Sequence, residues 1–270
     1  MQNKKEIIKV SYPIFLGLLA QNIINVTDTA FLGHVGEVEL GASALGGLYY
    51  ICLFTLAFGF SIGAQILMAR RNGEGKYQEL GTVLNQGSLF SFLMAIVLLV
   101  GAMLSARPVM QLMLSSEVIL EASYDFFSVR VWGLLFSFVN VMYRAFYVAI
   151  IRTKVLTLNA IVMASINVIL DYILIFGKFG APRLGLEGAA IASVMAEAGS
   201  LLFFLLYTRY AVDGKKYGLK FRLRLDFPVI RRILNVSVFM MLQQFIPFTT
   251  WFVFFLAIEH IGQRELAIAN

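Results

Sequence analysis

Residues 155–177 have the sequence VLTLNAIVMASINVILDYILIFG, an apolar run in which Asp171 is the one charged residue. A helix that crosses a bilayer needs about 20 consecutive, mostly apolar residues, because only a backbone that satisfies its own hydrogen bonds is tolerated in the hydrocarbon interior. The run has that length and that composition. It therefore predicts a membrane-spanning helix, and the same criterion applied along the chain decides the fold class.

Six further stretches of the 270-residue chain meet this criterion, at approximately 10–32, 44–69, 84–106, 126–150, 186–208 and 234–258. Hydrophobic residues make up 59% of the chain and charged residues 14%. Soluble domains carry roughly 25% charged residues, so a single water-soluble core is excluded. The sequence predicts an all-α polytopic membrane protein.

Basic residues are distributed unevenly over the predicted connections. With the N-terminus in the cytoplasm, sixteen cations lie on the cytoplasmic side and four on the other, a strong positive-inside bias. The sixteen are Lys4, Lys5, Lys9, Arg70, Arg71, Lys76, Arg152, Lys154, Arg209, Lys215, Lys216, Lys220, Arg222, Arg224, Arg231 and Arg232, and the four are Arg107, Lys178, Arg183 and Arg264. We therefore expect a bacterial inner-membrane protein with a cytoplasmic N-terminus. The net charge of +6 then reflects topology and contact with anionic lipid, not nucleic-acid binding.

Two other interpretations of the chain fail. The basic N-terminus followed by an apolar run is similar to a signal peptide, but the run is too long and has no convincing small-residue cleavage site. Cys52 is the only cysteine and lies within a predicted span, which excludes a disulfide framework and a cysteine-based metal site.

An internal repeat suggests how the chain is organised. Residues 10–44 align without a gap with 236–270, so that His34-Val35-Gly36 stands opposite His260-Ile261-Gly262. Transporters are often built from such repeated bundles. We therefore expect a six-helix lobe at 1–208, a basic cytoplasmic linker at 209–232, and at 233–270 the first helix and following loop of a second lobe. On this interpretation the chain is a fragment of a protein with about twelve helices.

Two predicted spans carry a carboxylate beside a neutral amide. Asp28, Asn25 and Gln21 share one helical face, and Asn167 and Asp171 lie one turn apart on another helix. An ionisable group deep in a membrane costs roughly 2.5 to 3.5 kcal/mol or more, so each is a functional candidate.

Paired carboxylates in a poorly hydrated site repel one another when both are ionised, so such a pair can load and release a proton. The same oxygens could instead ligate Na⁺, because hard cations prefer oxygen. In the plain alternative, Asp28 borders the outer end of its helix and Asp171 hydrogen-bonds locally.

Other polar residues are weaker candidates. Glu197, one turn from Ser193, is either a second proton site facing a cavity or a carboxylate paired with a neighbouring helix. Arg144 is expected to snorkel or to form an ion pair rather than to bind substrate. Asn140 and Tyr143 stand near it at helical spacing and, with Gln21, Asn25 and Glu197, are candidate cavity-lining residues.

Enzymatic motifs are absent or misplaced. The segment Gly59-Phe60-Ser61-Ile62-Gly63 fits the nucleophile-elbow pattern, but that motif needs a strand-turn-helix context and here lies in an apolar helix. Its two glycines are expected to form a helix-packing face. His34 and His260 are too isolated for zinc, and no Walker phosphate loop occurs, so an enzyme and an ATP-driven pump are both disfavoured.

Several motifs together resemble the multidrug and toxic compound extrusion (MATE) family, in particular its DinF-like branch. They are Pro13 through Gly36, Ala69-Arg70-Arg71-Asn72-Gly73-Glu74-Gly75, Arg152-Thr153-Lys154, Asn167 through Gly177, and Leu186 through Ser193. The resemblance implies a two-lobed antiporter that exports cationic or amphipathic compounds in exchange for H⁺ or Na⁺, without a cofactor, monomeric when full length and in contact with membrane lipids.

The resemblance also implies roles for individual residues. It assigns the cation or proton site to Asp28, Asn167 and Asp171, with the hydroxyl of Ser193 as a further ligand, and Pro13 is expected to be a hinge in the first helix. Other branches carry a glutamate in the seventh helix, whereas 234–258 has no acid, so a coupling site there is disfavoured. The alternative function is a flippase for lipid-linked oligosaccharides or lipid II, whose cavity commonly needs more cations than Arg130 and Arg144 supply.

Overall fold

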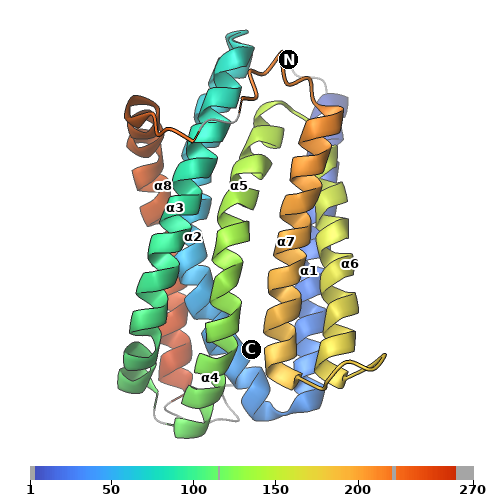
Figure 1. Cartoon of the computed structure of the whole chain (residues 1–270), viewed down its shortest axis with the longest axis vertical. Coiled ribbons are helices and arrows are strands. Elements are labelled where there is room, and N and C mark those ends of the chain that lie inside the picture. Colours follow the sequence, from blue (N-terminus) through green and yellow to red (C-terminus); the bar gives the residue numbers. More distant parts are fainter. Residues whose placement is uncertain (1–3, 115, 221–222, 260–270) are drawn as a thin grey trace.

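The structure, a computed structural model, describes residues 4–114, 116–220 and 223–259, and all regular structure within these ranges is helical. Long helices run side by side along the molecule (Figure 1). They are α1 (Lys4–Val35), α2 (Glu37–Gly73), α3 (Tyr77–Met113), α4 (Glu117–Arg130), the 3₁₀ turn η1 (Val131–Gly133), α5 (Leu134–Ala149), α6 (Lys154–Phe176), α7 (Gly185–Ala211) and α8 (Phe227–Glu259).

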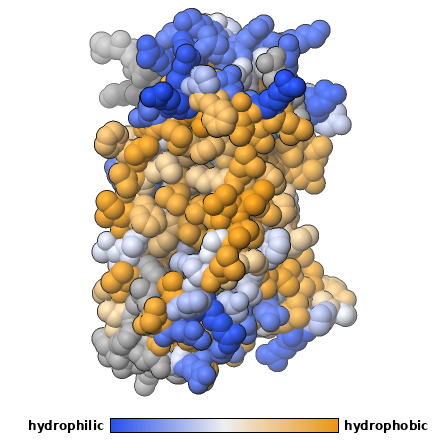
Figure 2. Space-filling view, turned by 60° about the vertical axis from the view of Figure 1, so that its left-hand side comes forward, coloured by the Kyte–Doolittle hydropathy of each residue, from blue (hydrophilic) through white to orange (hydrophobic). Residues whose placement is uncertain are grey.

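Seven segments of the described residues are long and apolar enough to cross a membrane, with α4, η1 and α5 together forming one of them. The face in Figure 2 has an apolar belt between two hydrophilic ends. The prediction of an all-α polytopic membrane protein is therefore confirmed.

The helices extend beyond the predicted apolar stretches. α2 begins at Glu37 rather than near residue 44, and α4 begins at Glu117 rather than near 126. Hydropathy marks only the part at hydrocarbon depth, whereas backbone hydrogen bonding continues into the polar interface. Side-chain capping then sets the end: Ser116, at the N-cap of α4, accepts a hydrogen bond from the backbone N of Ile119 at 3.4 Å.

Two groups of helices make up the bundle. α1 packs on α6 and α6 on α7, while α2 packs on α3, α4 and α5. α7 joins the groups through its contacts with α4 and α5. α8 lies along α2 and α3, on the far side of the bundle from α6 (Figure 1).

The α2–α8 contact is close because α2 presents glycines to it. A Cβ added at Gly59 would collide with the backbone of Met241, and one added at Gly63 would collide with Ser237. The hydroxyl of Ser237 donates a hydrogen bond across the contact to the carbonyl of Phe60 at 3.0 Å. The prediction that these glycines form a packing face is confirmed, which is the usual reason for small residues between membrane helices.

The segment between α7 and α8 is docked on the bundle. The backbone N of Gly81 donates to the carbonyl of Tyr217 at 2.8 Å, and the side chain of Gln86 donates to the carbonyl of Arg224 at 3.0 Å. Helix α7 runs to Ala211 and α8 begins at Phe227, so both ends of the predicted linker are helical. The division into two lobes stays a prediction.

Candidate functional site

Asp28 on α1 and Asp171 on α6 lie side by side where these two helices pack together. Asp171 is completely buried and Asp28 is half-buried. Their carboxyl groups are close enough to influence each other's charge. Two neighbouring carboxylates repel each other, and protonation of one of them removes that repulsion, so the pair can hold a proton.

Polar atoms of the pair and of Asn167, one turn away on α6, lack hydrogen-bond partners among the described residues. Among the described residues, no hydrogen-bond donor reaches either oxygen of Asp171 or the buried Oδ1 of Asp28, and neither amide atom of Asn167 has a partner. Asn167 is 1% exposed. A buried polar group without a partner costs roughly 1 to 3 kcal/mol. A bound proton or a hard cation would supply the missing partner of these oxygen atoms.

Local helix geometry explains why these side chains meet. Asn167 and Asp171 are four residues apart on α6 and are both buried, so they share its inward face. On α1, the buried residues Ile24 and Leu32 flank Asp28 at the same spacing and place it on the buried face.

The other predicted residues of α1 are Pro13, Gln21 and Asn25. Asn25 is exposed. The backbone at Pro13 and Gln21 is helical, but their side chains lie outside the described part of the structure, so the hinge and cavity-lining predictions stay predictions there.

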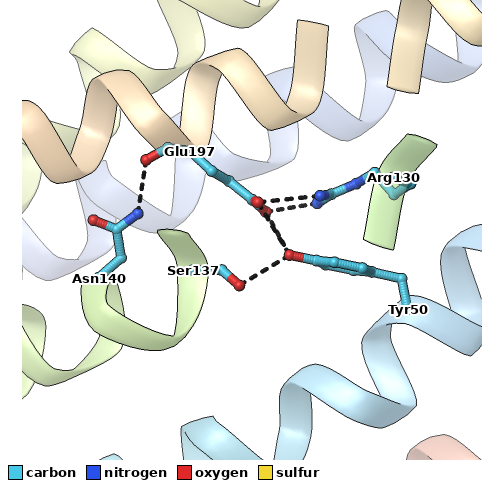
Figure 3. Close-up of polar contacts among 5 residues, drawn as sticks. All are labelled: Tyr50, Arg130, Ser137, Asn140 and Glu197. Carbon is cyan, nitrogen blue, oxygen red and sulfur yellow. Dashed lines mark hydrogen bonds and ion pairs between the residues drawn. The ribbon is translucent and has the colours of Figure 1, made fainter. Parts of the chain in front are cut away.

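A second polar cluster lies around Glu197 (Figure 3). The guanidinium of Arg130 forms an ion pair with Glu197, at 2.6 Å to Oε1 and 3.1 Å to Oε2. The hydroxyl of Tyr50 donates to Glu197 Oε1 at 2.9 Å and lies 2.9 Å from Ser137 Oγ. The side chain of Asn140 donates to the backbone carbonyl of Glu197 at 2.9 Å. We call these five residues the Glu197 network.

The network contains the pairing that one of the two sequence-based interpretations of Glu197 describes, and the cavity-lining role of Glu197 stays a prediction. Its carboxylate forms an ion pair with Arg130 on α4, and the residue is 5% exposed. Tyr50 and Ser137 were missed by the sequence analysis, because an uncharged hydroxyl in an apolar helix gives no signal of its own. Arg130 was noted, but nothing in its sequence neighbourhood indicates a partner on α7.

Three other candidates lie elsewhere. Ser193 is half-buried on α7, and no hydrogen bond among the described residues connects it to the Asp28–Asp171 pair. Tyr143 stacks on Phe204 with ring centroids 6.1 Å apart. The guanidinium of Arg144 stands 5.3 Å from the centroid of the Phe58 ring. The cavity-lining role of Asn140 and Tyr143 stays a prediction.

A membrane-spanning helical bundle with a buried acidic pair between two of its helices is typical of a secondary transporter. The family model described as MatE matches residues 13–173 of this chain. That is more than half of its length, so the chain belongs to the MatE family, as the sequence motifs predicted.

Named relatives agree with this assignment. The chain is 25% identical over 238 residues to the probable multidrug resistance protein NorM of Agrobacterium fabrum, covering 87% of this chain and 50% of the relative. It is 27% identical over 192 residues to the probable NorM of Bacillus anthracis, covering 71% of this chain and 42% of the relative. The chain thus spans about half the length of the curated relatives it matches. The DinF-like branch stays a prediction.

Solved structures share the fold. An inward-facing multidrug resistance MATE family transporter of the MOP superfamily superposes with a TM-score of 0.83 at 20% identity, covering 97% of this chain and 59% of that one. An outward-facing transporter of the same description superposes with a TM-score of 0.80 at 20% identity, covering 89% and 52%.

Proposed function

We propose that this chain carries the cation-coupling site of a secondary antiporter, which exports cationic or amphipathic compounds in exchange for H⁺ or Na⁺. Membership of the MatE family and the multidrug resistance names of its relatives support export of small molecules. The observation that carries the coupling proposal is the burial of the Asp171 carboxyl group beside Asp28 where α1 packs on α6, with oxygens that lack donors among the described residues.

The coupling ion would occupy the space between the two carboxyl groups. A proton would bridge them, whereas Na⁺ would be ligated by their oxygens and by the amide oxygen of Asn167, whose atoms lack other partners among the described residues. Either ion removes the repulsion between two carboxylates and so favours the state in which α1 and α6 are close. The hydroxyl of Ser193 is the weaker member of the proposed ligand set.

Exchange requires that ion and substrate favour different conformations of the lobe. We propose that ion binding at Asp28 shifts or bends α1 near Pro13, because proline removes a backbone hydrogen bond and is a common cause of helix kinks. The change would reduce the space for substrate and release it outward. On this proposal the protein resides in the bacterial inner membrane with a cytoplasmic N-terminus, and is monomeric when full length.

The proposal is tested by gradient-driven efflux of ethidium from cells that express the protein as its gene encodes it. We expect Asp28→Asn and Asp171→Asn each to reduce efflux by at least about tenfold, because one carboxylate cannot replace the pair. Asp125→Asn is the matched control, since Asp125 is an exposed acid on α4. Imposing a pH gradient and a Na⁺ gradient separately identifies the ion. Unimpaired efflux in both pair variants would remove the proposal.

A further inference from the structure

Arg144 carries a positive charge into the bundle, and no negative partner for it is found in the part of the chain that the structure describes. It lies on α5, and its guanidinium faces the ring of Phe58 on α2. The other arginine within this span, Arg130, is neutralised by its ion pair with Glu197. An unneutralised cation at membrane depth is expensive and by default indicates function.

The acids on the helices that pack on α5 are accounted for. On α2, α3, α6 and α7 they are Glu37, Glu39, Glu79, Asp171, Glu187 and Glu197. Asp171 interacts with Asp28, Glu79 pairs with Arg71, and Glu197 pairs with Arg130. Glu37 and Glu39 lie in the first turn of α2, and Glu187 lies in the first turn of α7. Within the described ranges, no acidic side chain forms an ion pair with Arg144.

Arg144 lies against a residue at its own level on α2. Helices α2 and α5 run in the same direction, and Tyr50 of α2 faces Ser137 of α5 at 2.9 Å. Phe58 lies eight residues beyond Tyr50 and Arg144 lies seven residues beyond Ser137, so Phe58 and Arg144 are at the same level. The guanidinium therefore lies against α2 at this level.

A ladder of aromatic rings on α2 ends at this guanidinium. Tyr50, Phe54 and Phe58 follow one another at four-residue intervals, with ring centroids 6.5 Å and then 6.2 Å apart. Arg130 covers the first ring at 3.7 Å and Arg144 covers the last at 5.3 Å. Phe54 and Phe58 are half-buried, so this end of the ladder offers apolar ring surface beside a guanidinium that pairs with no acid among the described residues.

We propose that Arg144 and the half-buried rings of Phe54 and Phe58 form a subsite for the anionic group of a transported amphipathic compound. A carboxylate would bind the guanidinium, which suits its planar geometry, and the apolar body would pack on the rings. This inference rests on the proposed export function and refines its substrate class: amphipathic compounds that carry a carboxylate are preferred over simple cations. An anionic lipid headgroup has the same chemistry, and the experiment separates the two sources.

The test compares two dyes that differ in one group. Rhodamine B carries a carboxylate beside its xanthylium cation, whereas its ethyl ester carries the cation alone. Gradient-driven uptake of each is measured in proteoliposomes that contain the protein as its gene encodes it. For Arg144→Gln we expect the ratio of carboxylate-dye to ester-dye transport to fall on the order of tenfold, with part retained in Arg144→Lys. Arg209→Gln, which removes an exposed guanidinium at the end of α7, is the matched control.

Three results would overturn the subsite. An unchanged ratio, or an equal loss of both dyes, would make Arg144 a structural residue. An effect seen only in vesicles that contain anionic lipid, and equal for both dyes, would assign the guanidinium to a headgroup. If the native protein moved neither dye, the export proposal would fail separately, and equilibrium binding of the two dyes to the purified native and Arg144→Gln proteins would still decide the subsite.

Discussion

Arg130 and Glu197 show how two opposite charges can be kept inside a membrane bundle. The ion pair is almost completely buried, and Tyr50 adds a hydrogen bond to the same carboxylate. Desolvation of two charges is costly, so the net contribution of such a pair is small. The loss of one partner is severe, however, because it leaves an uncompensated buried charge.

We therefore predict that Arg130→Met and Glu197→Leu each destabilise the purified protein by about 3 to 5 kcal/mol. The double variant should be much less destabilised, because no unpaired charge remains. Thermal unfolding in detergent measures the stability of the two single variants and of the double variant. Arg107→Met is the control, since the Arg107–Glu121 pair is about half exposed and should contribute only about 0 to 1 kcal/mol. Single variants as mild as this control would contradict the prediction.

The Asp28–Asp171 pair differs from the Glu197 network in one physical respect. Glu197 has donors on both carboxylate oxygens, whereas the oxygens of Asp171 have no donor among the described residues. A satisfied carboxylate is held in place, while an unsatisfied one is available to a mobile ion. This contrast supports the pair, rather than Glu197, as the exchange site.

At the level of elements, the span that contains Arg130 is interrupted. The 3₁₀ turn η1 separates α4 from α5 and ends at Gly133. A Cβ at this glycine would collide with the carboxylate of Glu197 and the guanidinium of Arg130. Gly133 is therefore the position at which the backbone makes room for the network.

Gly133→Ala should displace the Glu197 network and lower the unfolding temperature markedly. In the Arg130→Met, Glu197→Leu background the same change should be milder, because the colliding groups are gone, and a double-mutant cycle measures the difference. Gly101→Ala is the control: nothing lies within 4 Å of its added Cβ, so it should be neutral or stabilising by up to about 1 kcal/mol. Equal effects of Gly133→Ala in the two backgrounds would exclude the steric explanation.

On the scale of the whole molecule, cationic residues gather at one end of the bundle. The last turn of α2 and the turn that follows it carry Arg70, Arg71 and Lys76. Glu74 neutralises part of this charge: hydrogen bonds from Lys76, Arg70 and Arg71 lower its pKa to about 2. The apolar belt in Figure 2 separates this end from the other.

The charge distribution predicts that the basic end faces the cytoplasm. Because Cys52 is the only cysteine, a Cys52→Ser background allows single cysteines to be placed at Lys178, between α6 and α7, and at Lys215, between α7 and α8. We expect Lys178→Cys to react with a membrane-impermeant maleimide in intact cells, and Lys215→Cys to react only after lysis. The reverse pattern would invert the orientation.

Sequence-based prediction succeeded where the physics is local. The free energy of transferring residues into a membrane is nearly additive along the chain. Hydropathy therefore identified the seven spans of the described residues and the fold class. Helical geometry is equally local. It placed Asn167 and Asp171 on one face of α6, and it placed Gly59 and Gly63 on one face of α2. Helix ends were less accurate, because backbone hydrogen bonding and capping continue outside the apolar core.

The amino-acid sequence by itself determined the kind of the membrane helices, their number within the described ranges, the family of the chain and the acidic side chains most worth testing. Only the tertiary structure decided that Glu197 pairs with Arg130 and Tyr50, that Arg144 has no acidic partner among the described residues, and that α8 packs on α2. The physical reason is that these relations depend on the register between helices far apart in the chain. That register is set by how side chains and glycines fit across each contact, which no single stretch of sequence contains.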